Sequence, residues 1–313
     1  MGRVLVLGNA GLDLTLQVPR LPEKGETLLG DGAGSAPGGK GLNQAVTAAR
    51  TGAQVIFHAA IGHDAQGAQI AAALASEGIS ELELHHVPYS SDFSLLMVLP
   101  DGENSIVSAG SCAAALTVEM AENFAANTTT GDIVLLQGNL TQASTLAALA
   151  TATARGATTL FNPAPLWWDV GPLLPLCNIV IANRGEAKTI TGLSEPTAAA
   201  AALCRLGASI AIITLGAGGC LTSDSDGTIG HYPASKIRAI DTTGCGDTFC
   251  GVFAAMLAMG LGQETAINLA QSAAALTAQH RGAFTALPSR DELAALTARI
   301  ELARSGNGAA GED

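Results

Sequence analysis

Basic residues, aromatic residues and long apolar runs are all scarce in this sequence. Lys and Arg number 15 against 27 Asp and Glu, which gives the 313-residue chain a formal net charge of −12. Nucleic acid is a poor match, because a protein that neutralises phosphates needs a basic face, and the 4% of aromatic residues offer few stacking platforms. The sequence contains no run of 18 apolar residues and therefore predicts no membrane span.

Paired cysteines and metal-ligand spacings are also missing. The six cysteines are scattered and form no CxxC pair. The six histidines show no metal-ligand spacing either, and the adjacent His85 and His86 are interpreted as the polar end of a strand. The apolar run from Val4 to Leu7 is too short for a signal peptide. These features predict free thiols in a reducing cytoplasm and neither a zinc site nor a disulfide framework.

What the sequence does contain is a regular alternation of buried strands and helices. Hydrophobic residues make up 48% of the chain, enough for a large core. Strands are predicted at residues 3–7, 53–57, 133–136, 158–161, 179–182 and 210–214. Helices are predicted at residues 42–51, 64–77, 117–126, 142–155, 197–206, 247–259 and 289–303. Short buried strands joined by helices indicate a mostly parallel sheet covered on both faces.

Two stretches depart from this rhythm. Residues 15–37 carry alternating apolar residues followed by turn residues, and residues 82–108 resemble two or three strands with a hairpin turn at Asp101-Gly102. Together they predict a small β-sheet element outside the α/β body. Residues 305–313 lack apolar periodicity and are predicted to be a disordered tail.

Polar and glycine residues follow five of the predicted strands. Ligands bind beyond the carboxyl ends of strands in open α/β sheets, although ordinary turn chemistry selects the same residue types.

Two common nucleotide-binding sequence motifs are present only in part. The glycine-rich run from Gly34 to Lys40 is followed by Gly41 where a P-loop needs Ser or Thr, and Gly8 with Gly11 supplies only part of a dinucleotide motif.

The segment DTTGCGDTF, residues 241–249, stands directly before an amphipathic helix. Its glycines, Gly244 and Gly246, allow backbone N–H groups to converge at the positive end of the helix dipole, which suits a transferring phosphoryl group. Asp247 is unusual there, because a carboxylate repels phosphates. It is either an N-terminal cap or a general base that takes a proton from an attacking hydroxyl.

Four motifs together carry a resemblance to a known family. GGKGLN (residues 38–43), NRGE (183–186), TLGAGG (214–219) and DTTGCGDTF follow the order and spacing of the ribokinase-like, PfkB-type carbohydrate kinases, up to about residue 300. The resemblance implies one Rossmann-like, three-layer α/β/α domain over residues 1–304 that binds ATP. It also implies a β lid, near residues 12–37 and 88–109, that closes over the sugar and makes a homodimer contact.

The same resemblance implies roles for individual residues. Asp247 matches the catalytic base, and the N–H groups of Gly244, Cys245 and Gly246 match the anion hole. The expected sugar ligands are Asp13, Gly38, Gly39, Asn43 and Asn139. The expected nucleotide contacts are Asn183, Thr214, Gly216, Gly219 and Gln271. Asn183 and Glu186 match the element that organises Mg²⁺, mainly through water. Asp241, Thr243 and the loop around Gly282 resemble a site for a monovalent cation, usually K⁺.

Two departures from ribokinases concern the substrate. Gly11 stands where ribokinases have an asparagine, and Asn139 stands where they have a glutamate, so both changes remove partners for sugar hydroxyls. The sequence thus predicts ATP-dependent phosphorylation of a hydroxyl on a small sugar, with the sugar itself open. The alternatives are a nucleoside kinase on the same fold and a non-catalytic, sugar-responsive binding protein.

Overall fold

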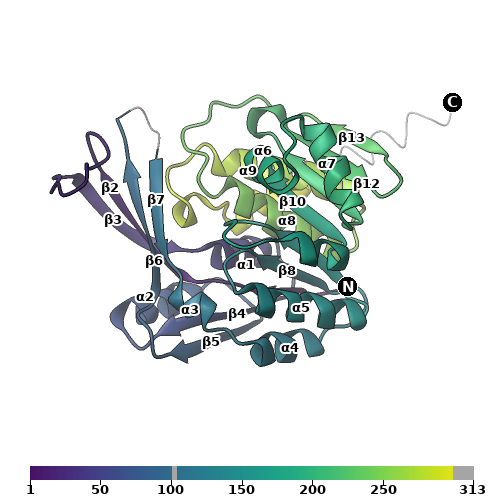
Figure 1. Ribbon diagram of the computed structural model, residues 1–313, viewed down its shortest axis with the longest axis horizontal. Coiled ribbons are helices and arrows are strands. Elements are labelled where there is room, and N and C mark those ends of the chain that lie inside the picture. Colours follow the sequence, from purple (N-terminus) through teal and green to yellow (C-terminus); the bar gives the residue numbers. More distant parts are fainter. Residues whose placement is uncertain (101–103, 299–313) are drawn as a thin grey trace.

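A nine-stranded sheet forms the centre of the protein in the computed structural model, which describes residues 1–100 and 104–298 (Figure 1). The strand order is β13-β12-β11-β10-β9-β8-β1-β4-β5, parallel throughout except at β12 and β13. The strands are β1 (Val4–Leu7), β4 (Val55–Gly62), β5 (Glu81–Val87), β8 (Ile133–Gln137), β9 (Thr158–Asn162), β10 (Ile179–Asn183), β11 (Ile210–Thr214), β12 (Cys220–Asp224) and β13 (Ile229–Tyr232).

Helices cover both faces of this sheet because its strands are apolar on both sides. In β1, Val4 and Val6 face one core, while Leu5 and Leu7 face the other. The first core is covered by α1 (Lys40–Arg50), α2 (Ala65–Leu74), α8 (Cys245–Ala258) and α9 (Gln263–Thr277). The second is covered by α3 (Ser111–Ala114), α4 (Val118–Ala126), α5 (Gln142–Ala154), α6 (Arg184–Thr191) and α7 (Pro196–Arg205). The predicted α/β/α architecture is confirmed.

A separate four-stranded sheet projects from one side of the body (Figure 1). Its order is β3-β2-β6-β7, from β2 (Gly11–Gln17), β3 (Asp31–Gly38), β6 (Asp92–Val98) and β7 (Asn104–Ala109). The central β2 and β6 run parallel, and each carries an antiparallel outer strand. We call this element the small sheet. The predicted hairpin turn at Asp101-Gly102 and the predicted tail lie outside the described residues.

The start of the second predicted β-rich stretch, residues 82–87, does not belong to the small sheet, so this part of the prediction is wrong. Residues 81–87 form β5, which pairs with β4 at the edge of the large sheet and takes no part in the small one. The physical reason lies in its alternation: Leu82 and Leu84 pack against the first core, while Glu81, Glu83 and His85 point to the opposite face. Alternation of this kind shows that a strand is half-buried, but not which sheet it joins.

Most predicted elements of the body are present with ends shifted by a few residues. The capping box at Ser289 and Glu292 is confirmed by hydrogen bonds of 2.8 Å from the Ser289 N–H and Oγ to the Glu292 carboxylate. Residues 290–298 are helical, and the last predicted residues of that helix, 299–303, lie outside the described part. Elements α3, α6, α9, β12 and β13 were not predicted. Among the described helices, none is both long and apolar enough to cross a bilayer.

Candidate active site

The strand order changes direction at β1. From β1 the chain builds outward through β4 and β5 on one side, and from β8 through β11 on the other. At such a switch point the connections after the neighbouring strands lead to opposite faces, which leaves a crevice beyond their carboxyl ends. Asn9 follows β1 and Asn139 follows β8, so both lie at this crevice.

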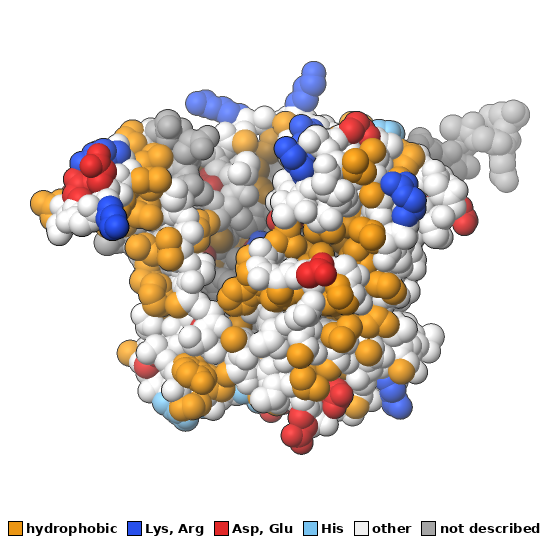
Figure 2. Space-filling model, in the orientation of Figure 1, with side chains coloured by type: hydrophobic (Ala, Val, Ile, Leu, Met, Phe, Trp, Pro, Cys, Tyr) orange, Lys and Arg blue, Asp and Glu red, His pale blue; other side chains and the backbone are white. Residues whose placement is uncertain are grey.

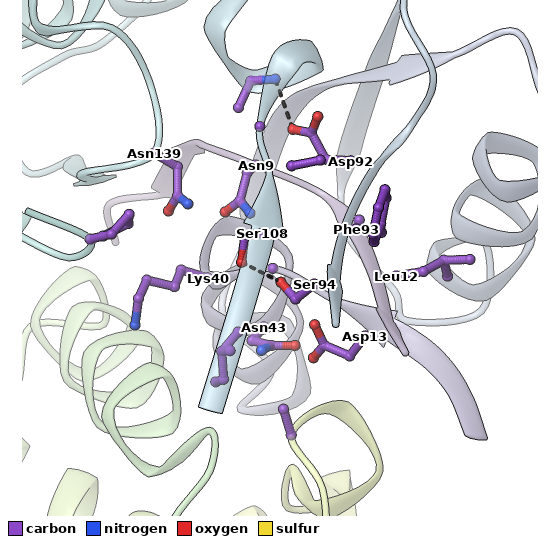
Figure 3. Close-up of a pocket in the computed structure, with 18 of the residues that line it drawn as sticks. Asn9, Leu12, Asp13, Lys40, Asn43, Asp92, Phe93, Ser94, Ser108 and Asn139 are labelled. Atoms are coloured by element: carbon purple, nitrogen blue, oxygen red, sulfur yellow. Dashed lines mark hydrogen bonds between the residues drawn. The ribbon is translucent and has the colours of Figure 1, made fainter. Parts of the chain in front are cut away.

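A cavity of about 510 Å³ occupies this position between the small sheet and the body. Figure 2 shows the hollow between these two parts. Its polar lining comes from Asn9, Asp13, Lys40, Asn43, Asp92, Ser94, Ser108, Asn139, Thr243 and Asp247. Figure 3 shows Asp13 and Asn43 turned toward the same space, with Lys40 and Asn139 on its other side. The cavity thus brings together Asn43 and Asp247, which belong to two of the motifs, with Asp13 and Asn139, which the resemblance also implied as sugar ligands.

The carboxylate of Asp247 lies at the base of the cavity and is held by two amides. Asp247 is only 6% exposed and belongs to the first turn of α8. Asn43 donates from Nδ2 to Oδ2 at 3.2 Å, and Gln44 donates from Nε2 to Oδ1 at 3.0 Å, both from the facing helix α1. Each carboxylate oxygen therefore has its own donor, which fixes the plane of the group.

A second layer of amides lies behind Gln44. Gln137, at the end of β8, donates from Nε2 to Gln44 Oε1 at 2.8 Å. Gln44 Nε2 also lies 3.3 Å from Asn162 Oδ1 at the end of β9, and Asn162 Nδ2 donates to the carbonyl of Ile181 at 2.9 Å. Since Gln44 and Gln137 are fully buried, these contacts replace water as their partners. The end of the sheet thereby sets the orientation of the Asp247 carboxylate.

Three charged groups gather around Asp247. Burial, followed by the negative charge of Asp247, raises the pKa of Asp13 to about 6. The Lys40 ammonium lies 3.8 Å from Asp247 Oδ1, and the pKa of Lys40 is raised mainly by that carboxylate. Burial raises the pKa of Glu186, and the positive charge of Lys40 acts against that shift. Lys40 is therefore a cation whose charge acts on both the cavity carboxylates and Glu186 at the start of α6.

The start of helix α8 is open to an anion. Gly244 precedes the helix with φ 79°, a left-handed conformation that disfavours side chains, and among the described residues no side chain caps the helix. The N–H groups of the first turn therefore have no side-chain acceptor, which suits a negatively charged group. Burial and the nearby carboxylates raise the pKa of Cys245 to about 11, so its thiol stays protonated at neutral pH.

Asn183 and Glu186 are joined in a reciprocal cap at the start of α6. The Asn183 N–H donates to Glu186 Oε2 at 2.8 Å, and the Glu186 N–H donates to Asn183 Oδ1 at 2.9 Å. Asn183 Nδ2 adds a third bond, to Glu186 Oε1 at 2.7 Å. Both carboxylate oxygens of Glu186 thus already accept hydrogen bonds, an arrangement that favours contact with a metal through water over direct ligation.

The other predicted nucleotide residues lie apart from the cavity. Asn183 pairs with Thr214 across β10 and β11, so both occupy the carboxyl edge of the sheet. Gly216 and Gly219 form the tight turn that follows β11. Gln271 lies on α9, which packs against α8, and its Oε1 is buried without a hydrogen-bond partner among the described residues. An unpartnered buried acceptor of this kind fits a donor such as the adenine amino group.

Asp241, Thr243 and Gly282, which are distant in sequence, do meet. Asp241 Oδ1 accepts from the Thr243 N–H and Oγ1 at 2.9 and 2.6 Å, and Oδ2 accepts from the Gly282 N–H at 2.9 Å. Burial alone would raise the pKa of Asp241, but these hydrogen bonds outweigh it and lower the pKa. The three residues line a second cavity, of about 840 Å³, which shares Leu96 and Thr243 with the first.

Gly11 has a structural explanation that the sequence did not reveal. A Cβ atom at this position would lie 2.6 Å from the carbonyl oxygen of Asp92, its partner in the parallel β2–β6 pair. A larger residue therefore cannot enter without displacing β6. Gly38 of β3 pairs with Gly11, and Gly39 follows it at the start of α1. Both predicted glycines therefore lie on the backbone segment next to Asp13.

Sequence reasoning also missed several residues of the site. Lys40 lies inside a quoted motif but received no role, and Gln44 follows the same motif directly. Asn9 accepts from the Gly41 N–H at 3.1 Å and so joins the end of β1 to α1. Trp167 is 56% exposed at the cavity and donates from Nε1 to the carbonyl of Gly138 at 2.5 Å. One sequence feature indicated Trp167: it lies shortly after the polar Asn162-Pro163 turn that follows a predicted strand.

Comparisons with known proteins agree with this geometry. The model of the pfkB family of carbohydrate kinases matches residues 1–290. Ribokinase from Mus musculus is 33% identical over 310 residues, 93% of each chain, and ribokinase from Haemophilus influenzae is 34% identical over 293 residues, 92% of this chain and 95% of that protein. The structure of Arabidopsis thaliana ribokinase complexed with ribose and ATP has a TM-score of 0.82 at 26% identity, covering 95% of this chain and 99% of that one.

The chain therefore belongs to the pfkB family of carbohydrate kinases. It is an ATP-dependent carbohydrate kinase, and the family, fold and enzyme class predicted from the four motifs are confirmed. The roles of individual site residues remain predictions.

Proposed function

We propose that this kinase transfers the γ-phosphoryl group of ATP to a hydroxyl of a small sugar, with Asp247 as general base. The observation that carries the proposal is the cavity itself. The Asp247 carboxylate faces it, and the buried Oδ1 atoms of Asn43 and Asn139 have no hydrogen-bond partner among the described residues. Sugar hydroxyls can donate to both oxygens, and a buried acceptor without a donor is costly.

In the proposed reaction, Asp13 and Asn43 bind the sugar so that one hydroxyl points at Asp247. Asp247 takes the proton of that hydroxyl as its oxygen forms a bond to the γ-phosphorus, and the bond from phosphorus to the bridging oxygen breaks to release ADP. The N–H groups of Gly244, Cys245 and Gly246 would stabilise charge on the phosphoryl oxygens, and the Lys40 ammonium would add to that stabilisation.

Two cations complete the proposal. Asn183 and Glu186 would hold Mg²⁺ through water, and Mg²⁺ would neutralise charge on the phosphates of the nucleotide. Asp241, Thr243 and Gly282 would hold K⁺ beside the start of α8. The convergence of Thr243 and Gly282 on the Asp241 carboxylate supports this site.

We further propose that residues 1–304 act as one kinase domain in the cytoplasm, with the small sheet as its lid. The small sheet contributes Asp13 to the cavity, so its position controls both substrate contact and access of water. Phe93 and Val107, exposed apolar side chains on one face of this sheet, support a homodimer contact through it.

The proposed activity is tested by measuring ADP formation with pentoses, hexoses, their phosphates and nucleosides, in K⁺ and in a large organic cation. We expect turnover with one or a few small sugars and faster turnover in K⁺. Equal rates in both cations would contradict the proposed K⁺ site. Turnover with nucleosides alone would show that the enzyme is a nucleoside kinase and not a sugar kinase.

Asn139 gives a prediction on substrate preference. Asn139→Glu should raise kcat/KM for ribose relative to other sugars in the same panel. Asn123→Glu, an exposed position on α4, should leave the order of preferred sugars unchanged.

The Mg²⁺ assignment gives a separate prediction. Glu186→Gln should raise the Mg²⁺ concentration needed for half-maximal activity by about 10–100-fold, the usual effect of losing a partner that orders a metal's ligands. Glu195→Gln is the matched control, because Glu195 also caps a helix, α7, through its carboxylate. If both variants give the wild-type Mg²⁺ titration, Glu186 acts only as a helix cap.

A further inference from the structure

We propose that His58, Glu83 and His85 form a binding site for a divalent transition-metal ion of the zinc class, on the outer strand pair β4–β5. One donor atom from each of the three side chains lies within 4.8 Å of the other two. The site lies on the opposite side of β1 from β8–β13 and shares no residue with the cavity described above. Two imidazoles and one carboxylate are a ligand set that suits zinc and similar metals.

Strand pairing explains why these residues meet despite their separation in sequence. His58 in β4 is the direct partner of Glu83 in β5, and His85 lies two residues further along β5 on the same face. The residue opposite His85 is Ala60, whose small side chain leaves room for the two imidazoles to approach. Their ring centroids are 5.6 Å apart, edge to face. Sequence spacing could not show this site, since its ligands are adjacent only across the sheet.

Each imidazole lies at the donor spacing of a tetrahedral metal from one oxygen of Glu83. Metal–ligand bonds of 2.0–2.2 Å at tetrahedral angles place neighbouring ligand atoms about 3.4 Å apart. Glu83 Oε2 lies 3.3 Å from His58 Nδ1, and Glu83 Oε1 lies 3.4 Å from His85 Nδ1. Glu83 is half-exposed, so its side chain can turn to place one oxygen between the two imidazoles, with water as the fourth ligand.

His58 is already held as a ligand would be. Phe124 of α4 packs against its ring edge to face, at 5.0 Å between centroids. The Nε2 atom of His58 is buried without a hydrogen-bond partner among the described residues, and Glu81 Oε1 lies 3.9 Å away. Metal-bound histidines commonly donate their second N–H to such a carboxylate.

Without a metal, the same cluster would be two histidines sharing one carboxylate through weak polar contacts. That alternative leaves the His58 Nε2 without a hydrogen-bond partner in the part of the chain that the structure describes, and it places the Glu83 carboxylate between two imidazoles. A divalent ion at His58 Nδ1 would fix the tautomer that carries its proton on Nε2, toward Glu81, and would neutralise the charge of Glu83. The ion would also tie the edge strand β5 to β4.

The test uses the full-length protein, stripped of metal by a chelator and kept in excess Mg²⁺ so that sites for hard cations are filled. Zn²⁺ binding is measured by calorimetry, and Tm is measured with and without Zn²⁺. We expect one tight Zn²⁺ site in the wild type and a higher Tm when it is filled. His85→Gln and Glu83→Gln should each weaken binding by about tenfold or more and abolish the Tm increase.

The matched control is His86→Gln, which alters the neighbouring histidine on the other face of β5, where it stacks on His63 at 4.6 Å. That variant should bind Zn²⁺ as the wild type does. Equal binding by wild type and His85→Gln would place the ion elsewhere, for example at thiols, and overturn the proposal. So would the absence of binding at about 100 µM Zn²⁺. Unchanged kcat in Mg²⁺ for all three variants is expected, because none of these residues lines the cavity.

Discussion

Replacing Asp247 by asparagine should lower kcat by roughly 10²–10⁴, the usual worth of a general base. The change keeps the size of the side chain but removes the negative charge that would accept the proton of the sugar hydroxyl. It also leaves one of the two donors, on Asn43 or Gln44, without an oxygen acceptor. Steady-state kinetics and ATP binding are measured together, since the nucleotide contacts are expected to remain.

A pH measurement separates this role from a structural one. Asp13, with its pKa raised to about 6, is a carboxylate above that pH and loses its negative charge as pH falls through it. Because the neutral group accepts weaker hydrogen bonds, KM for the sugar should rise below about pH 6. The charge of Asp247 is one cause of the raised pKa, so in Asp247→Asn the rise in KM should begin at lower pH. Asp226→Asn, at an exposed turn, is the control. Near-normal kcat in Asp247→Asn would exclude it as the base.

Gln44→Leu is expected to lower kcat by about tenfold to a hundredfold, because a hydrogen bond to a charged group contributes about 1.5–3 kcal/mol. Gln44 touches no substrate in the proposed reaction and acts as a positioning residue, by donating to Asp247 Oδ1 while accepting from Gln137. Its loss frees the carboxylate to rotate, so kcat should fall more than KM for the sugar changes. Gln54→Leu, at an exposed position before β4, provides the comparison.

The isosteric variant Gln44→Glu gives a distinguishing pH profile. When protonated, the new carboxyl group can still donate to Asp247, so activity at low pH should approach that of the wild type. As pH rises it ionises beside Asp247, and the repulsion should reduce kcat progressively relative to the wild type. A kcat ratio that stays constant across the pH range, in a folded variant, would mean that Gln44 has only a packing role.

Much of the fold could be predicted because the buried strands of the large sheet are continuous apolar runs. Residues 210–214 and 133–136, for example, are predicted within one residue. Helix α9 was missed because it follows α8 with no strand between them, so the strand–helix alternation does not indicate it, and its burial depends on packing against α8. Strand β5 was placed in the wrong sheet because its pairing partner, β4, is not a property of its own sequence.

The candidate site shows the same division between local and long-range information. Asp247 stands out in the sequence, since a carboxylate among glycines at a helix start conflicts with phosphate binding. Gln44 does not stand out, because its importance comes entirely from a carboxylate 203 residues away and from a buried strand end. Asn139 was found because it follows a predicted strand and matches a family position, while Trp167 lies in a loop and carries no periodic signal.

The pairing of α1 with α8 has a consequence for how the enzyme is made. The Asn43 amide and the Asp247 carboxylate are 204 residues apart, and the helices approach so closely that a Cβ at Gly251 would lie 2.4 Å from the Gln44 carbonyl. At 5–20 residues per second, a ribosome takes roughly 10–40 s to reach Asp247 after Asn43. During that interval the polar groups on the inner side of α1 have no carboxylate to bind. A nascent chain can therefore assemble most of its sheet yet stays inert until α8 emerges and docks.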